Sequence, residues 1–236
     1  GNTCYLNCVL QCLMSTEYLI SYFLDNEYEE DLNRNQLKYI LKKKEQMGLN
    51  IKITKNILNE TKKNTMTYDF YTLLKNYWSE KGINITPKSI KKRIGKLSED
   101  FSGSRQNDSE EALNIILDKL HEELLYSVEI NNELNENLIP FMNIYNLYGS
   151  IINDNNKSIE DKIRIGKIIK EYTKVSIDEF TVIKSCLYWN HYLKDNYSII
   201  KKVFTGLYLS KVKCSKCGYY NGTFDPFDSI QLQLPQ

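Results

Sequence analysis

Apolar residues recur at helical spacing along most of this chain and alternate with polar residues only toward its end. The first helical stretch starts at Cys4, with apolar residues at Tyr5, Leu6, Val9, Leu10 and Leu13. The same spacing predicts further amphipathic helices over residues 17–24, 36–47, 68–78, 88–95, 109–124 and 158–172. Alternation from Val203 to Val212, and again over 230–234, predicts strands around a tight turn. Helices that precede strands in this way are typical of an α+β fold.

The ends of several predicted helices carry residues that favour a start or a stop. Thr3 precedes the first helix, and Thr86 precedes the Pro87 start of another, so both threonines are expected to act as caps. Gly48 and Gly95 are expected to end their helices.

A helix that follows Asp108 or Ser109 has a clean one-sided apolar pattern, at Ala112, Leu113, Ile116, Leu117, Leu120 and Leu124. The region 127–180 is polar, Asn-rich and weakly patterned, except for one helix that starts at Ser158, where Asp161 completes an approximate capping box. This region is predicted to be an insertion on a larger fold.

The 236 residues are 42% hydrophobic and carry a net charge of +1, which suits one large domain or two small ones. The balanced charge indicates neither a nucleic-acid nor a membrane partner, and the apolar runs are too short to predict a membrane span. The six cysteines occur as one helical cluster, one isolated residue and one Cys-x-x-Cys, unlike a secreted disulfide scaffold. A reducing compartment, the cytoplasm or the nucleus, is therefore expected.

Cys4 is the strongest candidate for chemistry, because it lies in the first turn of a predicted helix. The positive end of the helix dipole stabilises a thiolate, which is the nucleophilic form of cysteine. The alternative is a buried apolar cysteine. A third interpretation is a metal site, since Cys4, Cys8 and Cys12 share one helical face, but this spacing differs from known iron–sulfur motifs and suits core packing better.

The sequence around Cys4 resembles the cysteine box of the ubiquitin-specific proteases, a papain-like family of deubiquitinases. The matching residues read Gly-Asn-Thr-Cys-Tyr-Leu-Asn-Cys-Val-Leu-Gln-Cys-Leu over residues 1–13, and Cys8 stands where the family usually has serine. The resemblance implies that Cys4 is the catalytic nucleophile. The family's side-chain oxyanion donor is an asparagine upstream of Gly1, so Asn2 is not that donor, whereas the backbone N–H of Cys4 can contribute.

A second segment, over residues 106–113, is similar to the Gln-rich box of the same family. Gln106, Asp108 and Glu111 match that box, and the resemblance implies that they bind substrate, with the aspartate in the channel for the C-terminal tail of ubiquitin. A carboxylate in such a groove can pair with an arginine of the tail. A plain helix cap is the alternative role for Asp108. The departures from the family's box are Asn107, Glu110 and Ala112.

A third match lies downstream, where residues 189–206 and the Cys214-x-x-Cys217-Gly218 motif resemble the start of the family's β-rich fingers. In that family such a pair is half of a four-cysteine zinc site. The resemblance therefore implies that Cys214 and Cys217 bind one structural zinc, together with a second pair further along a longer chain. No cofactor is implied for the chemistry. A redox pair is the alternative, although no thioredoxin-like pattern surrounds the motif.

Together the matches imply a papain-like cysteine protease fold. Its parts are a helical thumb over residues 1–126, an Asn-rich insertion with helices over 127–200, and the start of the β-rich fingers over 201–236, all within one truncated catalytic domain. The implied activity is hydrolysis of the isopeptide bond after the C-terminal glycine of ubiquitin. The implied partners are ubiquitin or ubiquitinated proteins.

The catalytic histidine of the family, and the Asp or Asn that orients it, come from a later box. Neither His121 nor His191 is therefore assigned to catalysis, and both are expected to be structural or surface residues. The 236 residues alone are expected to be inactive for the same reason. The alternative function is a catalytically inactive ubiquitin-binding scaffold on the same fold, which the departures at Asn107, Glu110 and Ala112 keep open.

Overall fold

The computed structural model describes residues 2–48, 52–79, 85–130, 134–218 and 220–233, and the chain forms two compact units. The first unit comprises Gly1–Ser127 and Asn196–Phe204, and the second comprises Val128–Asp195 and Thr205–Gln236. The chain therefore leaves the first unit, builds most of the second, and returns briefly to the first before it completes the second. The three-part division made from the sequence, at residues 126 and 200, stays a prediction.

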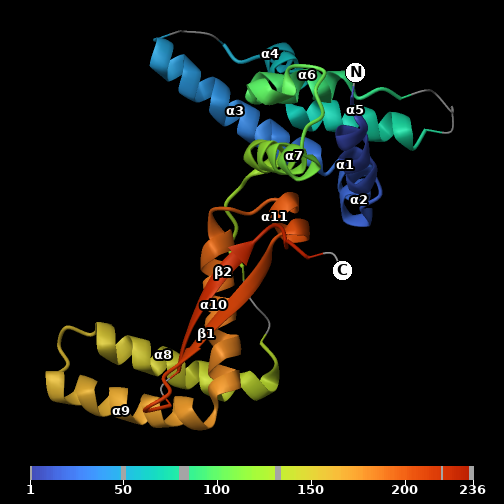
Figure 1. Cartoon of the computed structure of the whole chain (residues 1–236). Helices are drawn as coiled ribbons and strands as arrows, with labels where there is room; N and C mark the ends of the chain where they lie inside the picture. The colour runs from blue at the N-terminus through green and yellow to red at the C-terminus, as the bar shows by residue number, and fades with distance from the viewer. Residues whose placement is uncertain (1, 49–51, 80–84, 131–133, 219, 234–236) are drawn as a thin grey trace. The chain divides into compact units, whose positions relative to one another are not determined.

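Helices build the first unit, with α7 at its centre (Figure 1). Its elements are α1 (Cys4–Met14), α2 (Glu17–Leu24), α3 (Tyr28–Met47), α4 (Lys55–Lys63), α5 (Met66–Tyr77), α6 (Lys88–Leu97), the 3-10 turn η1 (Glu99–Phe101), α7 (Ser109–Leu124) and α11 (Ile199–Phe204). Helix α7 packs against α1, α3, α5, α6 and α11. The apolar face predicted for this helix is confirmed, since Ala112, Ile116, Leu117, Leu120 and Leu124 are all buried. The core of the unit thus fixes the start of α7 relative to α1.

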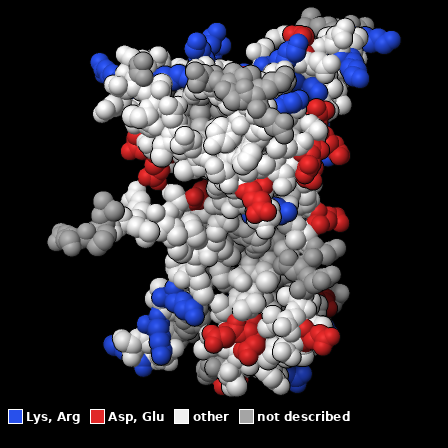
Figure 2. Space-filling view, turned by 90° about the vertical axis from the view of Figure 1, so that its right-hand side faces the viewer, with Lys and Arg blue, Asp and Glu red and all other residues white. Residues whose placement is uncertain are grey.

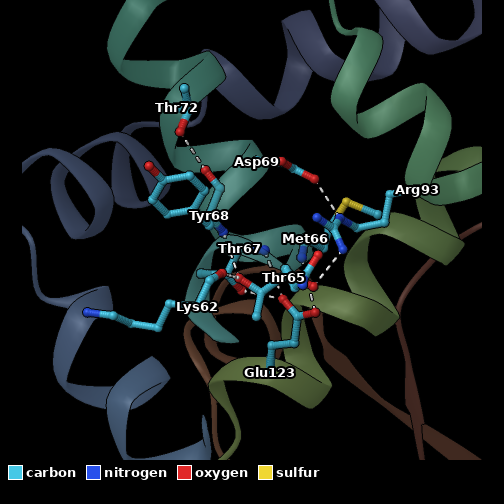
Figure 3. A network of polar contacts seen from close by, with 10 residues as sticks. Lys62, Thr65, Met66, Thr67, Tyr68, Asp69, Thr72, Arg93 and Glu123 are labelled. Carbon is cyan, nitrogen blue, oxygen red and sulfur yellow. Dashed lines mark hydrogen bonds and ion pairs between the residues drawn. The ribbon is translucent and has the colours of Figure 1, made fainter. Parts of the chain in front are cut away.

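A buried carboxylate from α7 holds the N-terminal end of α5 (Figure 3). The backbone N–H groups of Met66 and Thr67 donate to the Glu123 carboxylate at 3.1 and 2.8 Å, and the Thr67 hydroxyl donates to it at 2.8 Å. The Thr65 hydroxyl accepts from the N–H of Tyr68 at 3.1 Å. Burial raises the pKa of Glu123, whereas these hydrogen bonds act in the opposite direction. The first N–H groups of α5, which a helix leaves unpaired, are satisfied in this way.

Helix boundaries differ in places from the expectation. Helix α3 begins at Tyr28, well before its predicted start, because Tyr28 and Leu32 are buried and extend its apolar face. Gly48 ends α3 with a φ of 62°, as predicted. Thr86 does not cap α6, since Pro87 occupies the N-cap position. Helix α4 has only two apolar residues, Ile57 and Leu58, and buries neither fully, so apolar spacing alone does not predict it.

Gly95 does not end α6, contrary to the expectation, because the helix continues to Leu97. A Cβ atom at Gly95 would lie 3.0 Å from the Cα of Ser102 and 3.1 Å from the carbonyl oxygen of Phe101. Both distances are tighter than ordinary van der Waals contact. The glycine therefore allows η1 and the residue after it to pack directly on α6.

The second unit combines helices with a two-stranded antiparallel sheet. Its elements are η2 (Glu136–Leu138), α8 (Ile139–Asn153), α9 (Ile159–Val175), α10 (Ile177–Lys194), β1 (Gly206–Lys213) and β2 (Tyr220–Phe227). The predicted helix start at Ser158 is confirmed, because its hydroxyl accepts from the N–H of Asp161 at 3.1 Å. Two further helices, α8 and α10, form in the region where the sequence showed only a weak pattern. The sequence did not predict them, since α8 buries none of its residues and α10 buries only Phe180, Ile183 and Leu193.

The strands differ from the prediction at the start of β1 and after the end of β2. Strand β1 starts at Gly206 and pairs with β2 from Gly206↔Phe227 to Lys213↔Tyr220, whereas Val203 and Phe204 close α11. No strand forms over the described residues 228–233, and Leu234 lies outside them. A strand needs a partner, and Ile230 and Leu232 are instead exposed.

The order of helices first and strands later is confirmed, while the papain-like fold remains a prediction. Figure 2 shows charged side chains of both signs on the face in view, in keeping with the net charge of +1. Within the described ranges, the helices are too short or too polar to cross a membrane.

Candidate active site

Cys4 is the first residue of α1, and its side chain is exposed. The apolar residues of the helix are buried, namely Tyr5, Leu6, Val9, Leu10, Leu13 and Met14. Packing therefore fixes the helix and leaves the thiol on the surface, which excludes the buried-cysteine alternative. The thiol lies at the N-terminal end of α1.

Thr3 does not cap this helix with its side chain. It occupies the N-cap position, with φ of −117° and ψ of 12°, and its hydroxyl makes no capping hydrogen bond to the residues that the structure describes. A capping residue usually has an extended backbone, which Thr3 lacks. The Thr3 side chain therefore does not satisfy the N–H groups of the first turn.

Cys8 and Cys12 are exposed like Cys4 and follow it along one side of α1. The expectation that this face packs in the core is wrong, because the adjacent face with Val9 and Leu13 fills the core instead. The interpretation as a metal site finds no support either. Over the described ranges, no group of three or more His, Cys, Asp or Glu side chains could hold a metal ion.

The Tyr5 hydroxyl connects α1 to α6 through Lys91. The ammonium Nζ of Lys91 donates to Tyr5 Oη at 2.8 Å, to the carbonyl oxygen of Phe101 at 2.9 Å and to that of Gly103 at 3.1 Å. The rings of Tyr5 and Phe101 meet edge to face with centroids 5.7 Å apart, and Phe101 is fully buried. One lysine thus ties the cysteine-bearing helix to the segment that leads into the Gln-rich box.

Asn107 makes the same connection from the box itself. Its side-chain amide lies 3.4 Å from Tyr5 Oη. With the amide nitrogen facing the carbonyl oxygens of Asp100 and Gln106, at 3.3 and 3.0 Å, the amide oxygen faces the tyrosine hydroxyl, as the surrounding donors and acceptors require. Tyr5 then donates to Asn107 while it accepts from Lys91.

Asp108 caps α7, as one of its predicted roles requires. Its Oδ1 accepts from the N–H groups of Glu110 and Glu111 at 2.6 and 3.3 Å. The side chains of Gln106, Asp108 and Glu111 are all exposed. A capping carboxylate keeps free lone pairs, so this geometry leaves Asp108 able to accept from a ligand as well.

A pocket of about 640 Å³ lies beside α1. Thr3 and Asn7, which flank Cys4 along the helix, line it together with Leu73 and Tyr77 of α5 and the start of α6. The pocket offers both apolar and polar surface next to the first turn of α1. Such a surface suits part of an extended peptide.

The two histidines belong to different units. His121 is in the last turn of α7, where its Nδ1 is 2.7 Å from Oγ of the buried Ser198. The same oxygen accepts from the N–H of Lys201 at 3.3 Å, so His121 fastens α7 to the start of α11. His191 is exposed on α10 of the second unit. These positions agree with a structural role for His121 and a surface position for His191.

Cys214 and Cys217 are exposed in the turn between β1 and β2. The Gly218 N–H donates to the carbonyl oxygen of Cys214 at 3.0 Å, and Gly218 has a φ of 67°, which favours glycine. The pKa of the Cys214 thiol is lowered because the backbone N–H groups of Cys217 and Lys216 donate to its sulfur. Zinc binds the thiolate form, so this turn fits half of a structural zinc site.

Sequence reasoning missed Lys91, because Tyr5 is 86 positions away and the other two partners lie beyond the end of its own helix. One local signal could have revealed it. On α6, Lys91 follows Ile90 and precedes Ile94, and both isoleucines are buried. A lysine among apolar positions on one helical face therefore indicates a buried partner for its ammonium group.

The chain matches the family model described as "Ubiquitin carboxyl-terminal hydrolase" over residues 1–234. Similar proteins include "Ubiquitin carboxyl-terminal hydrolase 15" of Homo sapiens and "Ubiquitin carboxyl-terminal hydrolase 4" of Mus musculus, each 29% identical over 235 residues. Both alignments cover 100% of this chain but 18% of the relative, so the chain spans less than a fifth of these relatives. Because the family model covers nearly every residue, the chain belongs to the ubiquitin carboxyl-terminal hydrolase family.

Proposed function

We propose that this chain is the N-terminal part of the catalytic domain of a deubiquitinating thiol hydrolase, with Cys4 as the nucleophile. The Cys4 thiolate attacks the carbonyl carbon of the isopeptide bond after the C-terminal glycine of ubiquitin. The backbone N–H of Cys4 donates to the oxyanion that forms. The lysine amine then leaves with a proton from the general acid, and water hydrolyses the thioester to release ubiquitin.

The arrangement around Tyr5 supports this proposal most strongly. Cys4 is exposed at the start of α1, and the next residue is hydrogen bonded to Lys91 and to Asn107. These bonds keep the nucleophile and the Gln-rich box in one unit. A nucleophile needs a substrate held in a fixed geometry beside it, and this link is what would provide it.

The substrate tail fits the charge of the box. Ubiquitin ends in Leu-Arg-Leu-Arg-Gly-Gly, and a carboxylate accepts an arginine fork through two parallel hydrogen bonds. We propose that Asp108 and Glu111 bind the arginines of the tail and that the Gln106 amide binds its backbone. The exposed side chains of these three residues support this assignment.

The remaining catalytic groups are proposed to come from a later segment of the longer protein. His121 is engaged by Ser198, which leaves it a structural role. One structural zinc held by Cys214, Cys217 and a second pair would cross-link the fingers and would take no part in the reaction. All six cysteines are free, so we propose the cytoplasm or the nucleus as the compartment.

The test uses the full-length protein that contains this chain, together with a ubiquitin probe that carries a C-terminal electrophile. We expect one covalent adduct, located at Cys4 by peptide mass spectrometry. Cys4→Ala should abolish it. Cys8→Ala is the matched control, because Cys8 is also exposed and lies one turn later on the same helix. Labelling that survives Cys4→Ala unchanged would contradict the assignment.

The same experiment separates the enzyme from the ubiquitin-binding scaffold. The departures of Asn107, Glu110 and Ala112 from the family's box are the feature that favours a scaffold. If the wild-type protein binds ubiquitin in calorimetry but forms no adduct with the probe, the scaffold replaces the hydrolase as the function.

A further inference from the structure

We infer that Lys91 is a positioning residue, which holds the segment that precedes Asp108 against the helix that carries Cys4. This inference rests on the proposed function, because it assigns a role in the same site. Lys91 touches neither Cys4 nor the predicted tail-binding residues in any hydrogen bond that the described residues make. Its partners are instead Tyr5, Phe101 and Gly103.

The chemistry of lysine suits this position. An ammonium group has three donors and no acceptor, and the three partners of Lys91 use all of them. Two of these partners are backbone carbonyl groups around the end of η1, where no regular helix or strand supplies donors to them. The bond to the Phe101 carbonyl is partly buried, so this carbonyl needs a donor within the protein, whereas the Gly103 carbonyl is exposed and its bond to Lys91 serves to hold the segment. The third partner, Tyr5, belongs to α1, so its bond to Lys91 joins α6 to that helix.

Independent contacts hold the same segment on α6 and α1. Phe101 is fully buried against Tyr5, Gly95 admits Ser102 to the surface of α6, and Asn107 reaches the Tyr5 hydroxyl. Residues 102–105 are exposed, and within this stretch Gly103 accepts a hydrogen bond from Lys91 of α6. Loss of Lys91 should therefore loosen the approach to Gln106 and Asp108.

The helix that carries Cys4 has its own support, since six of its residues are buried in the core. Loss of Lys91 should thus leave the thiol where it is and displace only the surface that holds the substrate tail. The inference therefore predicts a selective effect. Reaction of Cys4 with ubiquitin should slow, whereas its reaction with a small electrophile should not.

The test compares two reagents on Cys4 of the full-length protein: the ubiquitin probe with its C-terminal electrophile, and iodoacetamide. For Lys91→Met, we expect the rate constant with the ubiquitin probe to fall by about tenfold or more, since small misplacements at a reacting site cost factors of this size. The rate constant with iodoacetamide should stay unchanged. Lys92→Met is the matched control, because it removes the same charge from the exposed next residue of α6 and should alter neither rate.

A second variant keeps the test valid if Lys91→Met folds poorly. Tyr5→Phe removes the hydroxyl that accepts from Lys91 and also contacts Asn107, and it should also slow the ubiquitin probe without slowing iodoacetamide. Because the two changes share the Lys91–Tyr5 bond, the double variant should be slowed by less than the product of the two single effects.

Three results would overturn the inference. The first is an unchanged rate with the ubiquitin probe in both variants. The second is an equal slowing with both reagents, which would make Lys91 a purely structural residue. The third is a wild-type protein that reacts with iodoacetamide but never with the ubiquitin probe, and this result would remove the proposed function together with the inference.

Discussion

Glu123 is a residue whose charge depends on its surroundings in the fold. Its side chain belongs to α7 and is 8% exposed, and three donors at the start of α5 reach its carboxylate. Burial raises its pKa above the ordinary value of 4.5, so the folded chain binds the proton more tightly than the unfolded chain. The contribution of Glu123 to the free energy of unfolding is therefore fully present below pH 4.5. It decreases as the pH rises through the raised pKa.

The first prediction follows from this decrease in the contribution of Glu123 with rising pH. Glu123→Gln removes the titration, so the unfolding free energy of the wild type minus that of the variant should fall as the pH rises from 4.5 through the raised pKa of Glu123, as measured by urea denaturation. Glu122→Gln is the control, because Glu122 is exposed and pairs with Lys119 at 2.6 Å. A difference that rises with pH would mean that the hydrogen bonds at α5 outweigh burial.

Gly95 gives the second prediction at this scale. Alanine is normally the better helix former by about 1 kcal/mol, but here its Cβ would crowd the backbone of Phe101 and Ser102. Gly95→Ala should therefore destabilise the first unit by about 1–3 kcal/mol in chemical denaturation. Gly166→Ala in α9, where nothing lies within 4 Å of the added atom, should instead stabilise its unit. Equal effects of the two substitutions would refute the close approach.

At the scale of elements, the sequence reveals helices that bury one face. Helices α1, α2, α5 and α7 are predicted from their apolar spacing because each buries residues on one side. Helices α4 and α8 bury no residue. The nine residues of α4 include only two apolar ones, Ile57 and Leu58, which is too short a pattern to predict a helix from apolar spacing. The alternation at Ile230 and Leu232 misleads for a related reason, since a strand depends on a partner that the local pattern does not contain.

In the candidate site, too, the local features are predictable from the sequence and the long-range contacts are not. Cys4 and Asp108 are predictable because a helix start is a local feature, and both residues lie at helix starts. The bonds of Lys91 to Tyr5 and of Tyr5 to Asn107 join residues 86 and 102 positions apart. No periodicity within one helix can specify such contacts, so they emerge only from the packing of α1, α6 and α7.

The turn between β1 and β2 provides the prediction for this scale. In the full-length protein we expect about one equivalent of zinc, because a structural site needs four ligands and this turn offers two thiols. Cys214→Ser should lower the zinc content, measured by plasma mass spectrometry, and should leave the labelling of Cys4 unchanged, since the two cysteines belong to different units. Cys186→Ser in α10 is the control. Full zinc content in Cys214→Ser would exclude this residue as a ligand.

At the scale of the whole molecule, residues 128–195 separate the two parts of the first unit. The two ends of this segment lie close together. The Val128 N–H donates to the carbonyl oxygen of Lys194 at 2.8 Å. Within the first unit, the Tyr126 N–H donates to the carbonyl oxygen of Tyr197 at 2.9 Å, and the two rings meet edge to face. The ends of the first unit are thus joined without help from the residues between them.

The last prediction rests on this contact between Tyr126 and Tyr197. A chain in which a short Gly-Ser linker replaces residues 129–193 should retain the first unit, because insertions whose ends lie close together are readily exchanged. Hydrogen exchange of the α7 amides should show protection similar to that in the intact chain. Rapid exchange throughout α7 would mean that the replaced residues are needed for the fold of the first unit.

Glu123 also imposes an order on the assembly of the newly made chain. It lies 57 positions after Met66, so α5 leaves the ribosome well before the carboxylate that completes its first turn. Until then, water must satisfy those N–H groups. His121 likewise forms its hydrogen bond only after Ser198, 77 positions later, has been synthesised. Domains generally form from the N-terminus during synthesis, but here α1, α3, α5 and α6 complete their packing only when α7 is available.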